Sequence, residues 1–167
     1  MIPLSAVSGT LNLSKTSHRN YELQLNGEVV GTLNRPSLWS QRFVADSQDG
    51  QWSFRRSGFC GSEIVDTESG QQIAFCKWTW GGKGQLTFAD GQTYQIGHEG
   101  FWRPVWTVSK ESREIVLQLH TREKRAELPD NTTMPDGRIA LLILFTWYCV
   151  LKAEDDAAAA VMVAAVS

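Results

Sequence analysis

The sequence predicts a mainly β protein, a closed antiparallel meander barrel of about 10–12 strands around a buried apolar C-terminal helix. Turn dipeptides recur at nearly equal spacing between residues 21 and 119, with no helical pattern between them. An apolar run then covers residues 139–151. The chain of 167 residues fits one domain, residues 1–167, which can bury a sizeable core.

The turn dipeptides set the number of strands. They are Asn26-Gly27, Asp49-Gly50, Ser69-Gly70 and Asp90-Gly91. Their glycines are 23, 20 and 21 residues apart, and a further 21 residues reaches Ser112 in a polar stretch. Each dipeptide favours positive φ and lies between β-branched or aromatic residues. Five hairpins give about ten strands, and the flanking segments can add one or two.

The apolar residues around Asp90-Gly91 predict the length of that loop. Leu86, Phe88, Tyr94 and Ile96 are all even-numbered. Residues paired across a hairpin share a face, so equal parity requires an odd loop length. A three-residue loop that ends in a left-handed Gly91 meets this requirement. The same parity at the turns around residues 26 and 69 predicts the same loop there.

The apolar run at residues 139–151 predicts the plug of the barrel. As a helix it spans about 20 Å, which is too short for a bilayer but matches the height of six- or seven-residue strands. A barrel of this size has a lumen that its own side chains do not fill. We therefore expect a plug helix over about 138–152. The Ala-rich segment 155–166 forms a second helix, a continuation or a mobile tail.

Composition excludes several classes of function. A net charge of −2, from 16 basic and 18 acidic residues, argues against non-specific nucleic-acid binding but leaves a local basic patch open. We expect no nucleic-acid partner. Three unpaired cysteines and the lack of a signal-peptide pattern predict a cytoplasmic protein, peripheral to a membrane if it associates with one. The three histidines show no metal-ligand spacing, and no nucleophile elbow or phosphate loop is present. We expect no metal, no cofactor and no enzymatic activity.

Several stretches resemble the tubby C-terminal-like superfamily, which includes phospholipid scramblases and LURP-one-related proteins. They are QWSFRRSG at residues 51–58, KWTWGG at 77–82, LTFADGQTY at 86–94 and GFW at 100–102, and they are similar to bacterial members. The likeness covers roughly residues 20–152. It implies a barrel of about twelve strands around a hydrophobic C-terminal helix, and association with anionic lipid. The calcium-binding segment and cysteine clusters of scramblases are missing, and no lipid-binding residue of the superfamily can be matched here.

Two groups of basic residues are candidates for an anionic headgroup site. One is Arg55 and Arg56, in a single predicted strand; the other is Arg122, Lys124 and Arg125 near the last strand. Arg122 and Lys124 would share a face in an extended segment, where they could hold a phosphate together. Nearby glutamates leave open the alternative of a solvated surface of mixed charge.

Trp102 and Trp106 are candidates for an interface, since their even separation places them on one face of a strand. Packing against the plug helix or across strands is the alternative. The leading hypothesis is a non-catalytic binding or scaffold domain that associates peripherally with anionic, phosphoinositide-like lipid. The alternative is a protein-interaction module that uses exposed aromatic residues or the Ala-rich segment. The sequence leaves the oligomeric state open.

Overall fold

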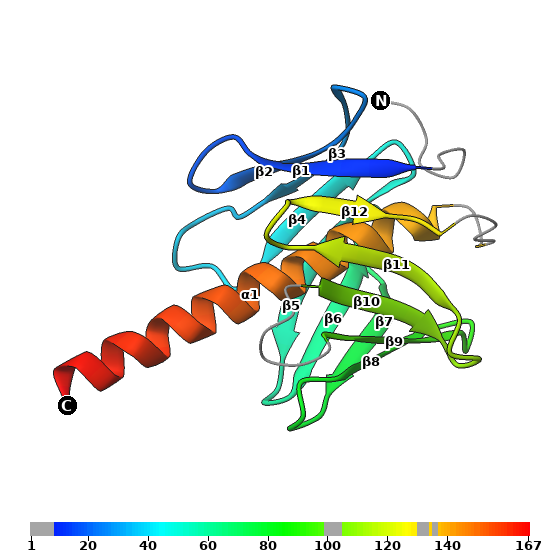
Figure 1. The fold of residues 1–167 in the computed structure, drawn as a ribbon. Helices are drawn as coiled ribbons and strands as arrows, with labels where there is room; N and C mark the ends of the chain where they lie inside the picture. The colour runs from blue at the N-terminus through cyan, green and yellow to red at the C-terminus, as the bar shows by residue number, and fades with distance from the viewer. Residues whose placement is uncertain (1–8, 99–104, 130–133, 135–136) are drawn as a thin grey trace.

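The computed structural model describes residues 9–98, 105–129, 134 and 137–167 (Figure 1). Twelve strands and one helix lie in this part of the chain. They are β1 (Thr10–Lys15), β2 (Asn20–Leu25), β3 (Glu28–Asn34), β4 (Phe43–Ser47), β5 (Gly50–Ser57), β6 (Gly61–Asp66), β7 (Gln72–Trp78), β8 (Gly84–Phe88), β9 (Thr93–His98), β10 (Val105–Lys110), β11 (Ile115–His120), β12 (Arg125–Glu127) and α1 (Arg138–Val166).

The strands form a closed antiparallel meander, as the sequence predicts. Each strand pairs with the next along the chain, and β1 closes the barrel against β12, with Leu11 opposite Ala126. Connections from odd to even strands therefore lie at one end of the barrel, and those from even to odd strands lie at the other.

The first half of α1 fills the barrel, which confirms the predicted plug. Residues 139–150 are all buried. The Phe54 ring of the wall meets the Phe145 ring of the helix edge-on, with centroids 5.3 Å apart at 81°. Thr146 is a polar residue on the plug. Its buried hydroxyl donates a hydrogen bond to the Leu142 carbonyl, one turn earlier in the same helix, at 2.7 Å. All-round apolarity of the segment is thus matched by all-round burial.

The second half of α1 leaves the barrel without a break. One helix runs through Lys152 to Val166, so the Ala-rich segment continues the plug rather than forming a second helix (Figure 1). Its side chains are exposed from Ala153 onward. At the other end of the helix, Arg138 donates to Asp90 at 2.9 Å and lies over the Phe88 ring at 3.9 Å.

The predicted loop is confirmed at Asp90-Gly91. The Phe88 N–H donates to the Gln92 carbonyl at 2.9 Å, which leaves three residues in the loop, and Gly91 has a φ of 89°. The side chains of Leu86, Phe88, Tyr94 and Ile96 are all buried.

The other two turns differ from the prediction. Asn26 and Gly27 form a two-residue turn with both φ values positive, 51° and 85°, and a bulge at Val30 restores the register. A four-residue loop, 67–70, connects β6 to β7, and a bulge at Ile73 follows it. The extra residue that parity requires lies in the strand at these two turns, not in the loop.

Candidate functional site: the mouth where the helix leaves the barrel

The described connections from odd to even strands form a rim around α1, which we call the exit mouth. They are the segments 15–20, 34–43, 55–61, 77–84 and 120–125, taken with the strand ends that flank them. Trp147, Leu151 and Glu154 of α1 line a hollow there together with Lys15 and Lys124, which places the departing helix inside this rim. Figure 1 shows α1 projecting beyond the barrel at this end.

The exit mouth is strongly basic. Its five segments carry eleven Lys or Arg residues and one acidic residue, Glu123. The described turns at the opposite end (25–28, 47–50, 66–72, 88–93 and 110–115) carry two basic and seven acidic residues. Although the net charge of the chain is only −2, the two ends of the barrel carry opposite charge. Such a charge distribution produces an electric field with its positive end at the mouth.

Exposed aromatic side chains lie on the same rim. Trp39 is 94% exposed in the β3–β4 connection, Phe59 is 77% exposed in β5–β6, and Trp80 is 92% exposed in β7–β8. Within the described part of the chain, these three are the aromatic side chains that stand out as exposed. Three successive connections thus present a ring to solvent beside Lys and Arg residues, a combination typical of surfaces that contact a membrane interface.

Arg55 and Arg56 lie at the end of β5 and point to opposite sides of the barrel wall. Arg55 pairs with Glu63 across the β5–β6 ladder. Arg56 follows the inward parity of Phe54, and its guanidinium donates to the Phe59 carbonyl at 3.4 Å. Arg56 is thus the member of the pair that faces the departing helix.

Arg122, Lys124 and Arg125 lie in the β11–β12 connection. Residues 121–124 form a tight turn with Lys124 in the left-handed region (φ 52°), so the extended segment expected for Arg122 and Lys124 is wrong. Arg125 forms ion pairs with Glu123 and Glu127. In the strand order, β5 and β12 are five strands apart by the shorter path around the barrel. The two basic groups therefore share the mouth but lie on opposite sides of α1.

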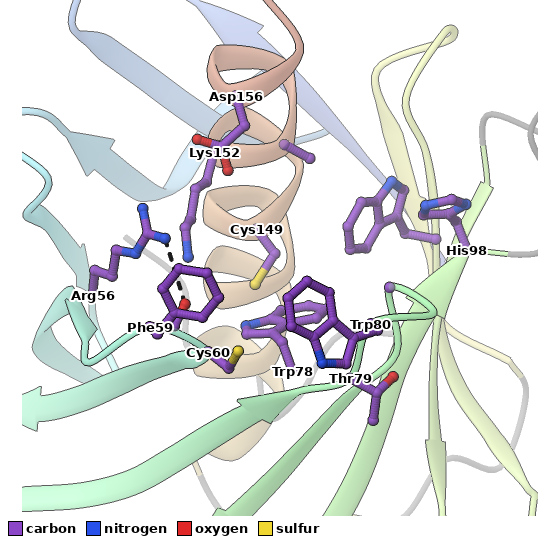
Figure 2. A pocket seen from close by; sticks show the side chains of 13 residues that line it. Arg56, Phe59, Cys60, Trp78, Thr79, Trp80, His98, Cys149, Lys152 and Asp156 are labelled. Carbon is purple, nitrogen blue, oxygen red and sulfur yellow. Dashed lines mark hydrogen bonds between the residues drawn. The ribbon is translucent and has the colours of Figure 1, made fainter. Parts of the chain in front are cut away.

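A cavity of about 280 Å³ opens in the mouth between the β5–β6 and β7–β8 connections, the β9–β10 pair and α1 (Figure 2). Trp106 lines it, half-buried, with its ring 6.3 Å from that of Trp78 and 5.1 Å from that of His98. Trp106 thus packs across strands, as in the alternative given above. Trp102, the other interface candidate, lies outside the described residues.

Burial raises the pKa values of two thiols and one phenol near the cavity. Burial raises the pKa of the Cys76 thiol and of the Tyr148 hydroxyl to about 12. Burial also raises the pKa of Cys149 well above its ordinary value. These groups stay protonated at neutral pH, and a thiol that stays protonated is a poor nucleophile.

The described residues contain no candidate metal site. No three His, Cys, Asp or Glu side chains in this part of the chain are grouped so that they could hold a metal ion. His120 contacts two glutamates, Glu123 at 3.4 Å and Glu127 at 3.1 Å.

Comparison with known proteins gives one relationship, and it concerns the fold. No protein-family model and no curated protein matches the sequence. The fold is similar to the X-ray structure of a LURP-one-related protein from Arabidopsis thaliana, with a TM-score of 0.57. The match covers 82% of this chain and 88% of that chain, at 16% sequence identity. This similarity supports a relationship at the level of the fold.

The helix of the described residues does not meet the requirements for crossing a bilayer. Among the described residues, no helix is both long enough and apolar enough to span a membrane. Lys152, Glu154, Asp155 and Asp156 interrupt α1 between its two apolar halves.

Proposed function

We propose that this protein is a non-catalytic binding domain that docks peripherally on anionic membrane surfaces through the exit mouth. The observation that carries the proposal is the concentration of Lys and Arg residues at one end of a barrel whose other end is acidic. Each Lys or Arg close to an anionic leaflet contributes about 1 kcal/mol. A headgroup with several phosphates, of the phosphoinositide kind, would contact more than one of these cations at once.

The exposed rings support the same orientation of the domain. Trp39, Phe59 and Trp80 lie on neighbouring connections, and the Phe59 and Trp80 rings are 6.1 Å apart. Aromatic rings are stabilised at the headgroup level of a bilayer, where one face is apolar and the edge is hydrated. Docking through the mouth would remove these rings from water and bring the cations to the phosphates in the same step.

The projecting part of α1 is compatible with this orientation. Residues 157–166 carry no charge, and Val161, Met162, Val163 and Val166 are exposed. Ten helical residues are about 15 Å long, half of the roughly 30 Å hydrocarbon core. The segment can therefore lie in the interface beside the docked barrel without spanning the bilayer.

The proposal includes membership of a superfamily and a location in the cell. The shared fold and the similar stretches support membership of the tubby C-terminal-like superfamily. A cytoplasmic protein at the inner leaflet would meet the anionic lipids that the mouth requires.

Flotation of the purified protein with liposomes tests the proposal. We expect binding to anionic vesicles at low salt, weaker binding at physiological salt, and none to neutral vesicles. The double variant Lys83→Gln/Arg122→Gln removes two mouth cations and should weaken binding roughly 10- to 30-fold. The matched variant Lys110→Gln/Arg113→Gln removes two cations from the opposite end and should bind like the parent. Absence of flotation under all conditions, or equal losses in both variants, would overturn the proposal.

A protein-interaction module is the second candidate, favoured by the exposed apolar side chains of residues 161–166. In that case a chain ending at Asp156 would lose its partner or its self-association but retain flotation with anionic vesicles. Sedimentation equilibrium of the two chains, run beside the flotation assay, distinguishes the candidates.

A further inference from the structure

The cavity in the exit mouth has an aromatic end and a cationic end. Trp78 and Trp106 meet edge to face at 75° on one side of it. Figure 2 shows the side-chain ends of Arg56 and Lys152 beside the Phe59 ring, at the other side. Three strand pairs and α1 contribute these walls, so the cavity exists only when the barrel has closed on its plug.

The size of the cavity sets the size of its occupant. Its volume is about 280 Å³. An apolar cavity of about 150 Å³ accommodates one benzene ring. The space therefore fits two fused rings or an alkyl chain of about eight to ten carbons, at the small end of the range for ligand sites.

The charges around the cavity set the polarity of its occupant. A second hollow of about 100 Å³ adjoins the first and shares Arg56, Lys152 and Asp156 with it. Two cations against one carboxylate leave one positive charge in excess at this point. Lys152 is half-buried on α1, where an anionic group would form a charge-assisted hydrogen bond of more than ordinary strength.

We propose that this cavity binds a single amphipathic anion, with its apolar part between Trp78 and Trp106 and its anionic group at Arg56 and Lys152. The inference goes beyond docking on a surface, because the ligand is one molecule held in a pocket that opens to solvent, and no bilayer is needed. The same chemistry, a short apolar chain with one terminal anion, is supplied by a free carboxylic acid or by one chain and the phosphate of a phospholipid.

The change in intrinsic tryptophan fluorescence on titration with monomeric decanoate tests the inference. We expect saturable binding of decanoate, binding at least tenfold weaker for decanol, and weaker still for decyltrimethylammonium, since only the first pairs with the two cations. Parallel titration with monomeric dihexanoylphosphatidate identifies the source, because tighter binding of this lipid assigns the site to phospholipid and tighter binding of decanoate assigns it to a free acid.

Variants on one strand provide the matched comparison. Arg56→Gln and Lys152→Gln should each weaken decanoate binding about tenfold. Arg55→Gln, next to Arg56 but on the outer side of the wall, should leave it unchanged. Equal affinities for decanoate and decanol, equal losses from Arg55→Gln and Arg56→Gln, or no saturable signal with any probe would overturn the inference. Because these titrations contain no vesicles, failure of flotation with intact decanoate binding refutes the surface proposal alone, and the reverse result refutes the cavity alone.

Discussion

The Arg35 guanidinium donates a hydrogen bond to the Asp155 carboxylate at 2.9 Å, which joins the β3–β4 connection to α1 where the helix leaves the barrel. The contact pairs one cation of the mouth with a carboxylate of the helix. Glu154 and Asp156 add further negative charge beside it. In the proposed docking mode, the acidic segment of the helix would therefore oppose the attraction of the rim for an anionic surface.

Neutralising these carboxylates should strengthen membrane binding. Asp155→Asn/Asp156→Asn releases Arg35 and removes two negative charges from the mouth, so we expect about tenfold tighter binding to anionic vesicles at low salt. Co-sedimentation over a lipid titration measures the change. Glu28→Gln/Glu111→Gln alters the total charge equally but at the opposite end, and should have little effect. Unchanged or weaker binding of the first variant would show that the mouth does not face the lipid.

The plug should dominate the stability of the fold. Phe145 is fully buried against Phe54, so Phe145→Ala leaves a cavity and should lower the free energy of unfolding by about 3–5 kcal/mol. Urea unfolding followed by circular dichroism measures this loss. Val163→Ala, on the exposed part of the same helix, should change the free energy of unfolding by less than about 0.5 kcal/mol. Leu144→Asp should prevent folding, and a folded Leu144→Asp protein would contradict the role of the plug.

The left-handed residue of the β8–β9 loop gives a local prediction. Gly91 has a φ of 89° and open space around the position of a Cβ atom, so Gly91→Ala costs backbone strain without a clash. We expect a loss of about 1–2 kcal/mol in unfolding free energy. Gly97→Ala is the matched variant, because an added Cβ there would meet its neighbours at ordinary contact distances of 3.6–3.8 Å. Similar losses in both variants would show that conformation at Gly91 is not the cause.

Much of the barrel could be predicted because its signals are local and repeated. Turn spacing gives the number of strands, and a segment that is apolar on all sides has to be enclosed. Loop lengths were less predictable, since a three-residue loop and a two-residue loop with a strand bulge satisfy the same parity. Val30 and Ile73 take up the extra residue inside strands. At the first turn, Asn26-Gly27 is a dipeptide that favours a two-residue loop, and this signal outweighed a three-residue loop.

The opposite charges of the two barrel ends can also be predicted from the sequence, but only after the order of the strands has been inferred. Successive turns of a meander alternate between ends, so basic and acidic turns that mix along the chain separate in space. The cavity was not accessible in this way. Trp78, Trp106 and Lys152 come from three distant segments, and equal parity of Trp78 and Trp80 does not reveal that one ring lines the wall while the other is almost fully exposed.

Thiol accessibility should separate the three cysteines. Cys76 and Cys149 are buried, and burial raises both pKa values, whereas Cys60 is partly exposed at the cavity. We expect iodoacetamide to modify Cys60 alone in the native protein and all three cysteines in urea, as read by mass spectrometry. Decanoate should slow the modification of Cys60 if it occupies the cavity. Rapid native modification of Cys149 would contradict the packing of the plug.

Stability should fall on the alkaline side because the buried thiols and phenol resist ionisation. The pKa of Cys76 is about 12 in the folded protein against 9.0 for an unburied thiol, so its contribution is complete below pH 9 and declines above it. For this thiol alone the decline reaches about 2 kcal/mol by pH 10.5, and Tyr148 adds to it above pH 10. Urea unfolding at pH 7.5, 9 and 10.5 measures the slope, which Cys76→Ala should flatten. Val116→Ala, another deletion in the buried wall, should lower stability equally at each pH, and an unchanged slope in Cys76→Ala would show that this thiol ionises elsewhere in the pH range.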